Sequence, residues 1–137
     1  MIRVNLFFFP AGLRRPVTAA VRKALAVRPR YVRGEINLVL VDNRKICAIN
    51  RRYRGVRKVT DIISFNLGAQ KPGEITGDIY IARERSRRQA AEQGHSWQDE
   101  LNYLAIHGVL HVFGYTDYTP GERVKMFSVQ DRLWKCL

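Results

Sequence analysis

The chain has 137 residues and a formal net charge of +12 at pH 7, and its length suits one domain with one hydrophobic core. No apolar run approaches the roughly 18 residues of a membrane span, and "VNLFFFP" near the N-terminus is too short for the apolar region of a signal peptide. The two cysteines, Cys47 and Cys136, are too far apart to suggest a disulfide framework or a paired-cysteine metal site, so we expect a single domain over residues 1–137 in the cytoplasm.

The first half of the chain is predicted to alternate strands with helices. Continuous or alternating apolar runs indicate strands. Helical spacing of apolar residues, beginning at Pro16 in one segment and after Asp42 in another, indicates amphipathic helices. The predicted elements of this half are a strand at 4–9, a helix at 16–27, a strand at 35–42 and a helix at 43–54.

The second half is predicted to contain two short strands followed by three helices. Ser96, with Asp99 three residues later, is a typical start for the longest helix, and Val124, Phe127 and Leu133 are candidates for packing in the last one. The predicted strands are at 61–67 and 77–82, and the predicted helices are at 83–93, 96–113 and 119–134. This order predicts an α+β fold, with a mixed sheet of about four strands covered by helices.

The segment "HGVLHVFGYTD" (107–117) combines residue types that bind metals. His107 and His111 are one helical turn apart, so both imidazoles can point to one position. Gly114 can end the helix in a left-handed conformation, which lets the chain turn back and bring Asp117 toward the pair. Three protein ligands with an open position are typical of catalytic zinc, so we expect a metal site on this late helix and the following turn. The alternative is a pair of histidines that only border a core helix.

The positive charge is concentrated in the first half. Arginine supplies 18 of the 24 basic residues, and its planar guanidinium can bind two phosphate oxygens at once. Residues 1–60 hold 15 basic and 2 acidic residues, whereas residues 61–137 hold 9 and 10. This asymmetry predicts that a polyanion binds a surface formed largely by the first half. An organism with an arginine-rich proteome is the alternative explanation, and an acidic membrane surface is less favoured because no basic amphipathic helix with aromatic anchors stands out.

Several motifs resemble those of one family. "HGVLHVFGYTD" is similar to the signature of the YbeY-type rRNA maturation endoribonucleases, which reads His-Gly-x-Leu-His-(Leu)-x-Gly-Tyr-Asp-His. The segments "INRRYRGVRKVTDIISF" (49–65), "GDIYIA" (77–82) and "MFSVQDRLW" (126–134) resemble further motifs of that family, in the family's order. Where the family usually has a third histidine, this chain has Asp117, which is also a legitimate zinc ligand.

The resemblance implies a metal-dependent endoribonuclease, specific for single strands, that acts in maturation of the 3′ end of small-subunit rRNA and in ribosome quality control. It implies one Zn²⁺ per chain held by His107, His111 and Asp117, although the carboxylate makes the site more favourable to a harder ion such as Mn²⁺. It also implies that Arg54, which matches an arginine near the family's metal, is catalytic and binds the scissile phosphate. The expected partner is RNA, as rRNA or the ribosome, and neither DNA nor a membrane is expected.

Two other functions remain open. A metallohydrolase of another class, such as a peptidase, would use the same ligands. Gly108, however, stands where a zinc peptidase has its general-base glutamate. A ribosome-associated RNA-binding module with a structural metal would keep the basic surface and catalyse nothing. In either case, Arg54 could be a solvated arginine at the end of a helix.

Other residues near the motifs have structural interpretations. Gly108 would allow its helix to lie close to a neighbouring strand. His95, which precedes the same helix, is expected at the surface or in a cap and not among the ligands. Asp61, Ser64 and Asp78 are interpreted first as structural residues of the predicted strands, with a catalytic role for Asp61 or Ser64 as the alternative.

Overall fold

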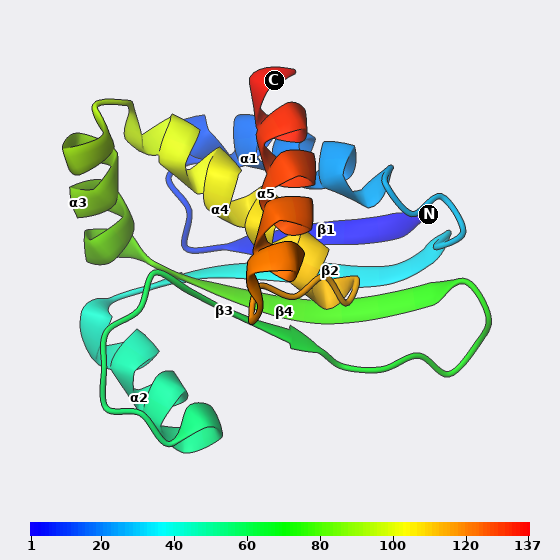
Figure 1. Cartoon of the computed structure of the whole chain (residues 1–137), viewed down its shortest axis with the longest axis horizontal. Helices are drawn as coiled ribbons and strands as arrows, with labels where there is room; N and C mark the ends of the chain where they lie inside the picture. The colour runs from blue at the N-terminus through cyan, green and yellow to red at the C-terminus, as the bar shows by residue number, and fades with distance from the viewer.

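The computed structural model describes residues 1–137, and its elements follow the predicted order (Figure 1). The strands are β1 (Ile2–Phe7), β2 (Arg33–Val41), β3 (Ile62–Asn66) and β4 (Glu74–Ala82). The helices are α1 (Ala11–Leu25), α2 (Asn43–Arg54), α3 (Arg83–Gln93), α4 (Trp97–Val112) and α5 (Pro120–Lys135). The predicted α+β fold with one mixed sheet is confirmed. None of the helices has the length and apolar character that crossing a membrane requires.

The four strands form one sheet in the order β1-β2-β4-β3. β1 pairs in parallel with β2, and β2 in parallel with β4, whereas β3 is antiparallel to β4. β3 is therefore an edge strand, and one side of its backbone has no strand partner. Arg54, at the end of α2, and residues 62–65 of β3 line the same cavity, so this edge strand lies near the end of α2.

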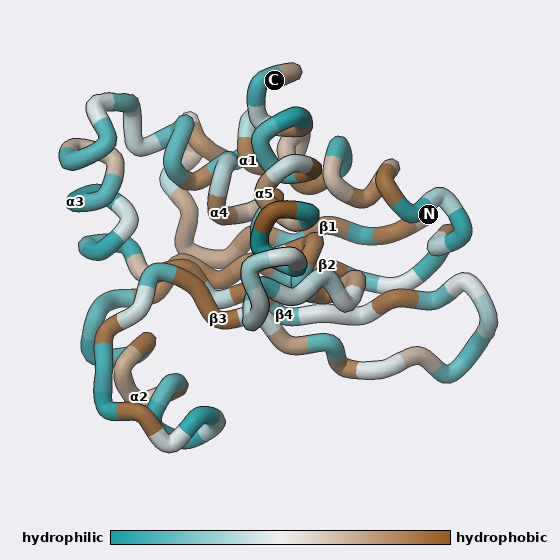
Figure 2. The backbone as a smooth tube through the Cα atoms, viewed as in Figure 1, coloured by the Kyte–Doolittle hydropathy of each residue, from teal (hydrophilic) through white to brown (hydrophobic).

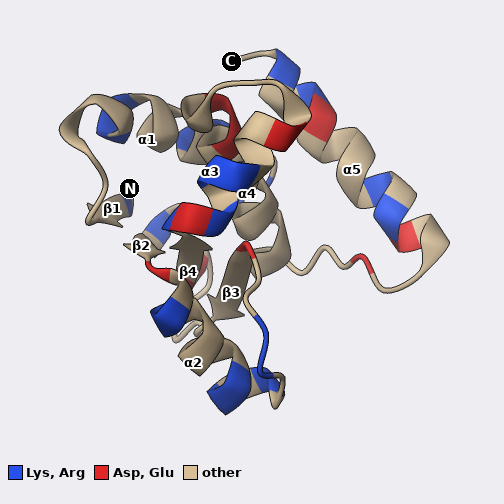
Figure 3. Cartoon of the chain, turned by 90° about the vertical axis from the view of Figure 1, so that its left-hand side faces the viewer, with Lys and Arg blue, Asp and Glu red and all other residues tan.

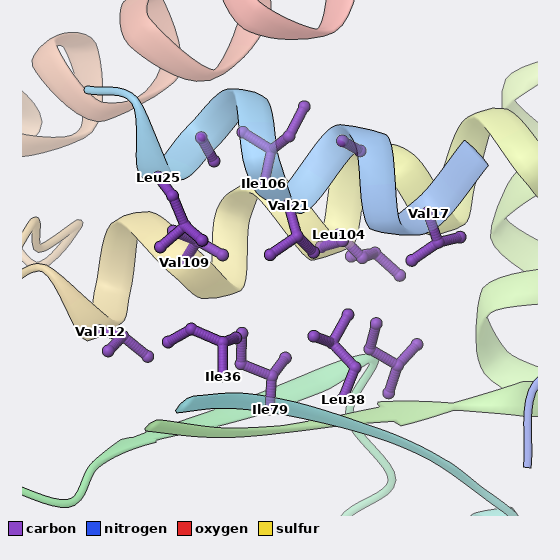
Figure 4. Close-up of a cluster of buried hydrophobic side chains, with 14 of the residues drawn as sticks. Val17, Val21, Leu25, Ile36, Leu38, Ile79, Leu104, Ile106, Val109 and Val112 are labelled. Carbon is purple, nitrogen blue, oxygen red and sulfur yellow. The ribbon is translucent and has the colours of Figure 1, made fainter. Parts of the chain in front are cut away.

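Helices cover both faces of the sheet (Figure 1). α1 and α4 lie on one face, with α5 packed against α4, and α2 lies on the other. The main core forms where α1 and α4 meet β2 and β4, with Val21, Leu104, Ile36 and Ile79 among its buried side chains (Figure 4). A smaller cluster lies under α2 and includes Ile46. Successive strand residues point to opposite faces, so the same strands supply both clusters.

The hydropathy of the chain follows these layers. In Figure 2 hydrophobic segments occur along the strands, whereas most of α3 is hydrophilic. The buried residues of α1 and α4 are mostly apolar. The N-terminal caps predicted for two helices are also present. The Asp42 side chain accepts a hydrogen bond from the backbone N–H of Lys45 at 2.8 Å, and the Ser96 side chain accepts one from the backbone N–H of Asp99 at 3.0 Å. These caps satisfy backbone donors that the first turn of a helix leaves free.

Some boundaries differ from the sequence prediction. α1 begins at Ala11 and continues through Pro16, because a single proline removes only one backbone hydrogen bond when packing holds the helix in place. The first strand was predicted to extend to residue 9, but β1 ends at Phe7. The next residue, Phe8, has a positive φ of 68° and is 76% exposed. Val124 does not pack as expected and is 72% exposed, because α5 faces α4 through Met126 and its neighbours on that side.

Candidate metal centre and active site

The position of α4, which carries both histidines, depends on Gly108. A Cβ atom at Gly108 would lie 2.7 Å from Cγ2 of Ile79 in β4 and 3.1 Å from Cδ1 of Ile62 in β3. Both distances are shorter than ordinary van der Waals contacts. The absence of a side chain at Gly108 therefore lets α4 lie against β3 and β4, as the sequence predicted, and brings its histidines beside the edge strand.

The three predicted ligands lie close together. The Nε2 atoms of His107 and His111 are 3.0 Å apart, and Oδ2 of Asp117 is 3.7 Å from Nε2 of His111. One ligand atom from each residue lies within 4.8 Å of the others. Ligand atoms around a tetrahedral Zn²⁺ are about 3.4 Å apart, given bonds of roughly 2.0–2.1 Å. The residues therefore fit a divalent ion with only small side-chain movements.

The turn after α4 brings Asp117 to the histidines. Gly114 has a φ of 99°, a conformation that disfavours residues with a side chain. The backbone N–H of Tyr115 donates to the carbonyl of Leu110 at 3.0 Å, and that of Gly114 to His111 at 2.9 Å, which is the pattern of a Schellman motif. Arg123 in α5 also donates to the carbonyl of Asp117 at 3.2 Å. The turn is thus held by both helices that it connects.

A second hydrogen bond links Thr116, the neighbour of Asp117, to α5. The Thr116 hydroxyl donates to the Glu122 carboxylate, and this contact holds the pKa of Glu122 below its usual value. Thr116 stands where the family signature has an acidic residue, so the chain replaces that acid with a donor to Glu122. The contact adds to the constraints on the turn that carries Asp117.

Gln130, which the sequence analysis did not identify, orients His107. Oε1 of Gln130 is 3.0 Å from Nδ1 of His107, and Nε2 of Gln130 donates to the carbonyl of Tyr103 at 3.3 Å. An amide oxygen only accepts hydrogen bonds, so Nδ1 carries the proton and Nε2 has a free lone pair for a metal. Gln130 is fully buried on the face of α5 that carries Met126, and a glutamine on an apolar helix face is the signal that could have revealed it.

His111 is in an environment that favours the neutral imidazole. Burial lowers the pKa of His111, and the nearby His107 lowers it further, while Asp117 acts in the opposite direction. The neutral form is the one that binds metals. The surroundings of His111 therefore prepare it for coordination.

The predicted site residues line one cavity of about 460 Å³. His107, His111 and Asp117 form one side of it, β3 and the segment before it form another, and Arg54 lines it from the end of α2. The Arg54 side chain is exposed. The fold thus brings together an arginine and three potential ligands that are 53 to 63 residues apart in the sequence.

Ser64 is a further polar residue in this cavity. Its hydroxyl is buried and has no hydrogen-bond partner in the protein. Ser64 lies on the side of β3 that faces α4, between Ile62 and Asn66, and Asn66 donates to the carbonyl of Val112 at 2.9 Å. Buried hydroxyls normally have a partner, so Ser64 is a candidate for contact with a group bound in the cavity.

Three other polar residues mainly form contacts within the protein. His95 lies 2.6 Å from Glu100 through its Nε2 atom and does not line the cavity. Asp61 accepts a hydrogen bond from Gln89 at 3.2 Å, although it also lines the cavity, and Asp78 accepts one from Asn37 at 3.1 Å. These contacts agree with their interpretation as structural residues.

Basic residues of the first half do not form one surface. Arg14 and Arg22 donate to the carbonyls of Leu6 and Ile2, at 2.6 and 2.7 Å, and so link α1 to β1. Figure 3 shows further Lys and Arg residues along α2 and in the segment between α2 and β3.

Three basic residues border a second cavity next to the first. Arg54, Lys58 and Arg85 line a space of about 430 Å³, which shares Arg54, Thr60 and Asp61 with the cavity of the histidines. Arg85 belongs to α3 and therefore to the second half of the chain. The basic residues beside the candidate site therefore come from both halves of the chain, whereas the charge distribution predicted a surface formed largely by the first half.

Comparisons with known proteins agree with these features. The model of the family Endoribonuclease YbeY matches residues 11–137. The Endoribonuclease YbeY of Endomicrobium trichonymphae is 41% identical over 98% of this chain and 92% of its own length. That of Bacillus subtilis (strain 168) is 41% identical over 73% of this chain and 70% of its own length.

A solved structure shares the fold. The solution structure of TM1509 from Thermotoga maritima superimposes with a TM-score of 0.66 and covers 98% of this chain and 87% of that protein, at 24% sequence identity. At this identity the similarity concerns the fold alone. The family match and the curated relatives are the stronger finding, and they show that the chain belongs to the YbeY family of endoribonucleases.

Proposed function

We propose that this protein is a single-domain, metal-dependent endoribonuclease that cleaves single-stranded RNA in the cytoplasm. The observation that carries the proposal is the cavity that His107, His111, Asp117 and Arg54 line together. Membership of an endoribonuclease family supports the same chemistry. The resemblance of the motifs supports rRNA as the substrate, with maturation of the small-subunit 3′ end and ribosome quality control as the processes.

One Zn²⁺ per chain is the proposed cofactor, held by Nε2 of the two histidines and by the carboxylate of Asp117. Zinc accepts two imidazoles and one carboxylate and keeps a position open. The carboxylate also makes Mn²⁺ acceptable to this site. When bound, the ion supplies a Lewis acid for a phosphoryl oxygen of the substrate.

Arg54 is the proposed phosphate-binding and catalytic residue. It is the last residue of α2, which Gly55 ends in a left-handed conformation with a φ of 70°. The exposed guanidinium can bind two oxygens of the scissile phosphate and stabilise the charge that develops there. Lys58 and Arg85, which line the adjoining cavity, are the proposed contacts to a neighbouring phosphate of the same strand.

The preference for single strands rests on the walls of the cavity. The open edge of β3 presents backbone groups, and Tyr115 and Tyr118 present aromatic rings. These groups contact a base only when its edges and faces are free, as they are in unpaired RNA. A duplex would offer mainly its backbone.

The test removes the metal from the protein, restores it, and then assays the protein on a single-stranded RNA, on the same sequence in a duplex and on a peptide. We expect cleavage of a single-stranded RNA by the restored protein, little cleavage of the same sequence in a duplex, and none of a peptide. Arg54→Ala should keep its metal and lose about a hundredfold or more in kcat/KM, as expected when a preorganised donor is removed. Cleavage of the peptide instead would favour the peptidase alternative. RNA binding with a steep salt dependence but no product would favour the binding module.

A further inference from the structure

A groove lies between α2 and the face of the sheet opposite the main core. It has a volume of about 330 Å³, and its walls come from α2 and from strands β3 and β4. Figure 1 shows α2 on the side of these strands opposite to α4. We call it the aromatic groove because three of its lining residues are Tyr53, Phe65 and Tyr80. None of them has a part in the function proposed above.

The three rings form a cluster in which Phe65 and Tyr80 are partly buried and Tyr53 is exposed. The Phe65 ring centroid is 4.9 Å from that of Tyr53 and 6.1 Å from that of Tyr80, and both pairs are in edge-to-face geometry. Tyr53 is 60% exposed. An aromatic ring that is exposed beside a groove offers the flat face on which proteins stack unpaired bases.

The charges at the groove favour an anionic ligand with polar edges. Lys45 and Arg52 lie among its lining residues, and the Arg52 guanidinium is 5.6 Å from the centre of the Tyr53 ring. Asp78 also lines the groove, and its Oδ1 atom accepts from Asn37. Phosphates suit the two cations, and the amino group of a base suits the carboxylate. An apolar or purely acidic partner would leave one of these charges without a match.

The aromatic groove adjoins the cavity of the histidines. Phe65 lines both spaces, and the preceding residue, Ser64, lines only the cavity of the histidines. Tyr53 lines the groove, and the next residue, Arg54, lines the cavity. Adjacent residues of β3, and likewise of α2, therefore line the two neighbouring spaces. If an RNA strand binds with one phosphate at Arg54, its next nucleotide can reach the groove.

We propose that the aromatic groove binds one unpaired base of the RNA, adjacent to the nucleotide at the metal centre. Tyr53 stacks on this base, Asp78 accepts a hydrogen bond from its edge, and Lys45 and Arg52 contact the phosphate beside it. The inference rests on the proposed function and adds a specificity subsite to it. Only a base without a pairing partner can enter, so the groove contributes to the selection of single strands.

The test compares Tyr53→Leu with Tyr53→Trp in the metal-loaded protein. Loss of one stacked base corresponds to roughly a tenfold weaker interaction, so we expect Tyr53→Leu to raise KM about tenfold on a single-stranded RNA. Its kcat and metal content should stay within about twofold of the wild type. Tyr53→Trp should have a KM close to that of the wild type, because tryptophan keeps an aromatic face for stacking. Phe8→Leu is the matched control, since Phe8 is also an exposed aromatic residue and follows β1, at the opposite edge of the sheet.

A second arm replaces each nucleotide in turn by an abasic one. In the wild type, an abasic nucleotide at one position next to the cleavage site should raise KM about tenfold. In Tyr53→Leu, the abasic nucleotide at that position should leave KM unchanged. The subsite is refuted if the wild type cleaves normally and neither Tyr53→Leu nor any abasic substitution changes KM. That result would leave the proposed function intact. A dimer that Tyr53→Leu dissociates would assign the groove to a second copy and would also overturn it.

Absence of cleavage by the wild type would count against the proposed function and not against the subsite. In that case the affinity of a labelled single-stranded RNA decides the question. A loss of about tenfold in Tyr53→Leu supports the subsite, and equal affinities overturn it.

Discussion

At the scale of single residues, the candidate metal centre depends on a side chain that binds no metal. The amide of Gln130 fixes the protonated nitrogen of His107 and leaves the other nitrogen free. The closeness of His107 and His111 follows from helical spacing and that of Asp117 from the turn at Gly114, so the sequence was sufficient to predict that the three proposed ligands lie together. Gln130 was not predicted, because its role depends on how α5 packs against α4, which no local pattern contains.

The orientation of His107 is tested by removing its acceptor. Gln130→Leu leaves a buried N–H without a partner, and we expect the affinity for Zn²⁺ to fall about 10–100-fold. Gln130→Glu keeps an acceptor and should bind the ion at least as tightly as the wild type. Competition with a chromophoric chelator measures both affinities. Equal affinities for the wild type and Gln130→Leu would show that the contact does not orient the ligand.

The lowered pKa of His111 predicts a pH dependence of stability in the metal-free protein. Because the folded-state pKa lies below the ordinary value of 6.5, the unfolded chain binds more protons between these two values. The free energy of unfolding should therefore be highest above about pH 6.5 and should fall as the pH decreases through the folded-state pKa. Thermal unfolding in a chelator between about pH 5 and 8 measures this effect.

His111→Asn is the control for that titration, because it removes the group with the lowered pKa. Its melting temperature should depend less on pH over the same range than that of the wild type. Identical slopes in the two proteins would show that His111 is not the source of the pH dependence.

At the scale of elements, the order of strands and helices could be predicted because apolar periodicity and caps are local signals. Asp42 and Ser96 begin their helices as expected. The start of α1 was missed because packing overrides the local signal of Pro16. The aromatic groove and the unpartnered state of the Ser64 hydroxyl could not be predicted either, since they depend on which side of β3 faces which helix. Residues distant in the sequence decide that arrangement.

The close approach of α4 to the sheet can be tested at Gly108. Gly108→Ala places a methyl group against Ile79 and Ile62, and overpacking of this kind costs about 1–3 kcal/mol of stability. It should also weaken metal binding, because the helix that carries both histidines must move. Gly121→Ala is the matched control, since a Cβ there meets nothing within 4 Å. Urea unfolding measures the free energy of unfolding of both variants. An equal loss of stability in Gly108→Ala and Gly121→Ala would contradict the tight contact at Gly108.

At the scale of the whole molecule, the basic residues behind the net charge of +12 have different surroundings. Arg14 and Arg22 hold carbonyls of β1, whereas Arg54, Lys58 and Arg85 surround two adjoining cavities. Composition could predict a polyanionic partner but could not separate these two groups. Only the fold assigns each arginine to a carbonyl or to a cavity.

The division of charge predicts different salt dependences. Each phosphate contact contributes a slope of about −0.7 to a plot of log affinity for single-stranded RNA against log salt. Lys58→Ala and Arg85→Ala should each make the slope shallower by about this amount, and Arg14→Gln should leave it unchanged. Fluorescence anisotropy of a labelled RNA between about 50 and 200 mM salt measures the three slopes. A change in Arg14→Gln as large as in Lys58→Ala would contradict the assignment.

The most direct test of the central claim is the metal content of the purified wild type beside Asp117→Ala and His111→Ala, with each sample assayed on single-stranded RNA. Mass spectrometry of the metals should find about one divalent ion per wild-type chain, and both variants should lose the ion together with cleavage. An ion that remains in Asp117→Ala, or cleavage that survives its removal, would contradict a catalytic centre formed by His107, His111 and Asp117.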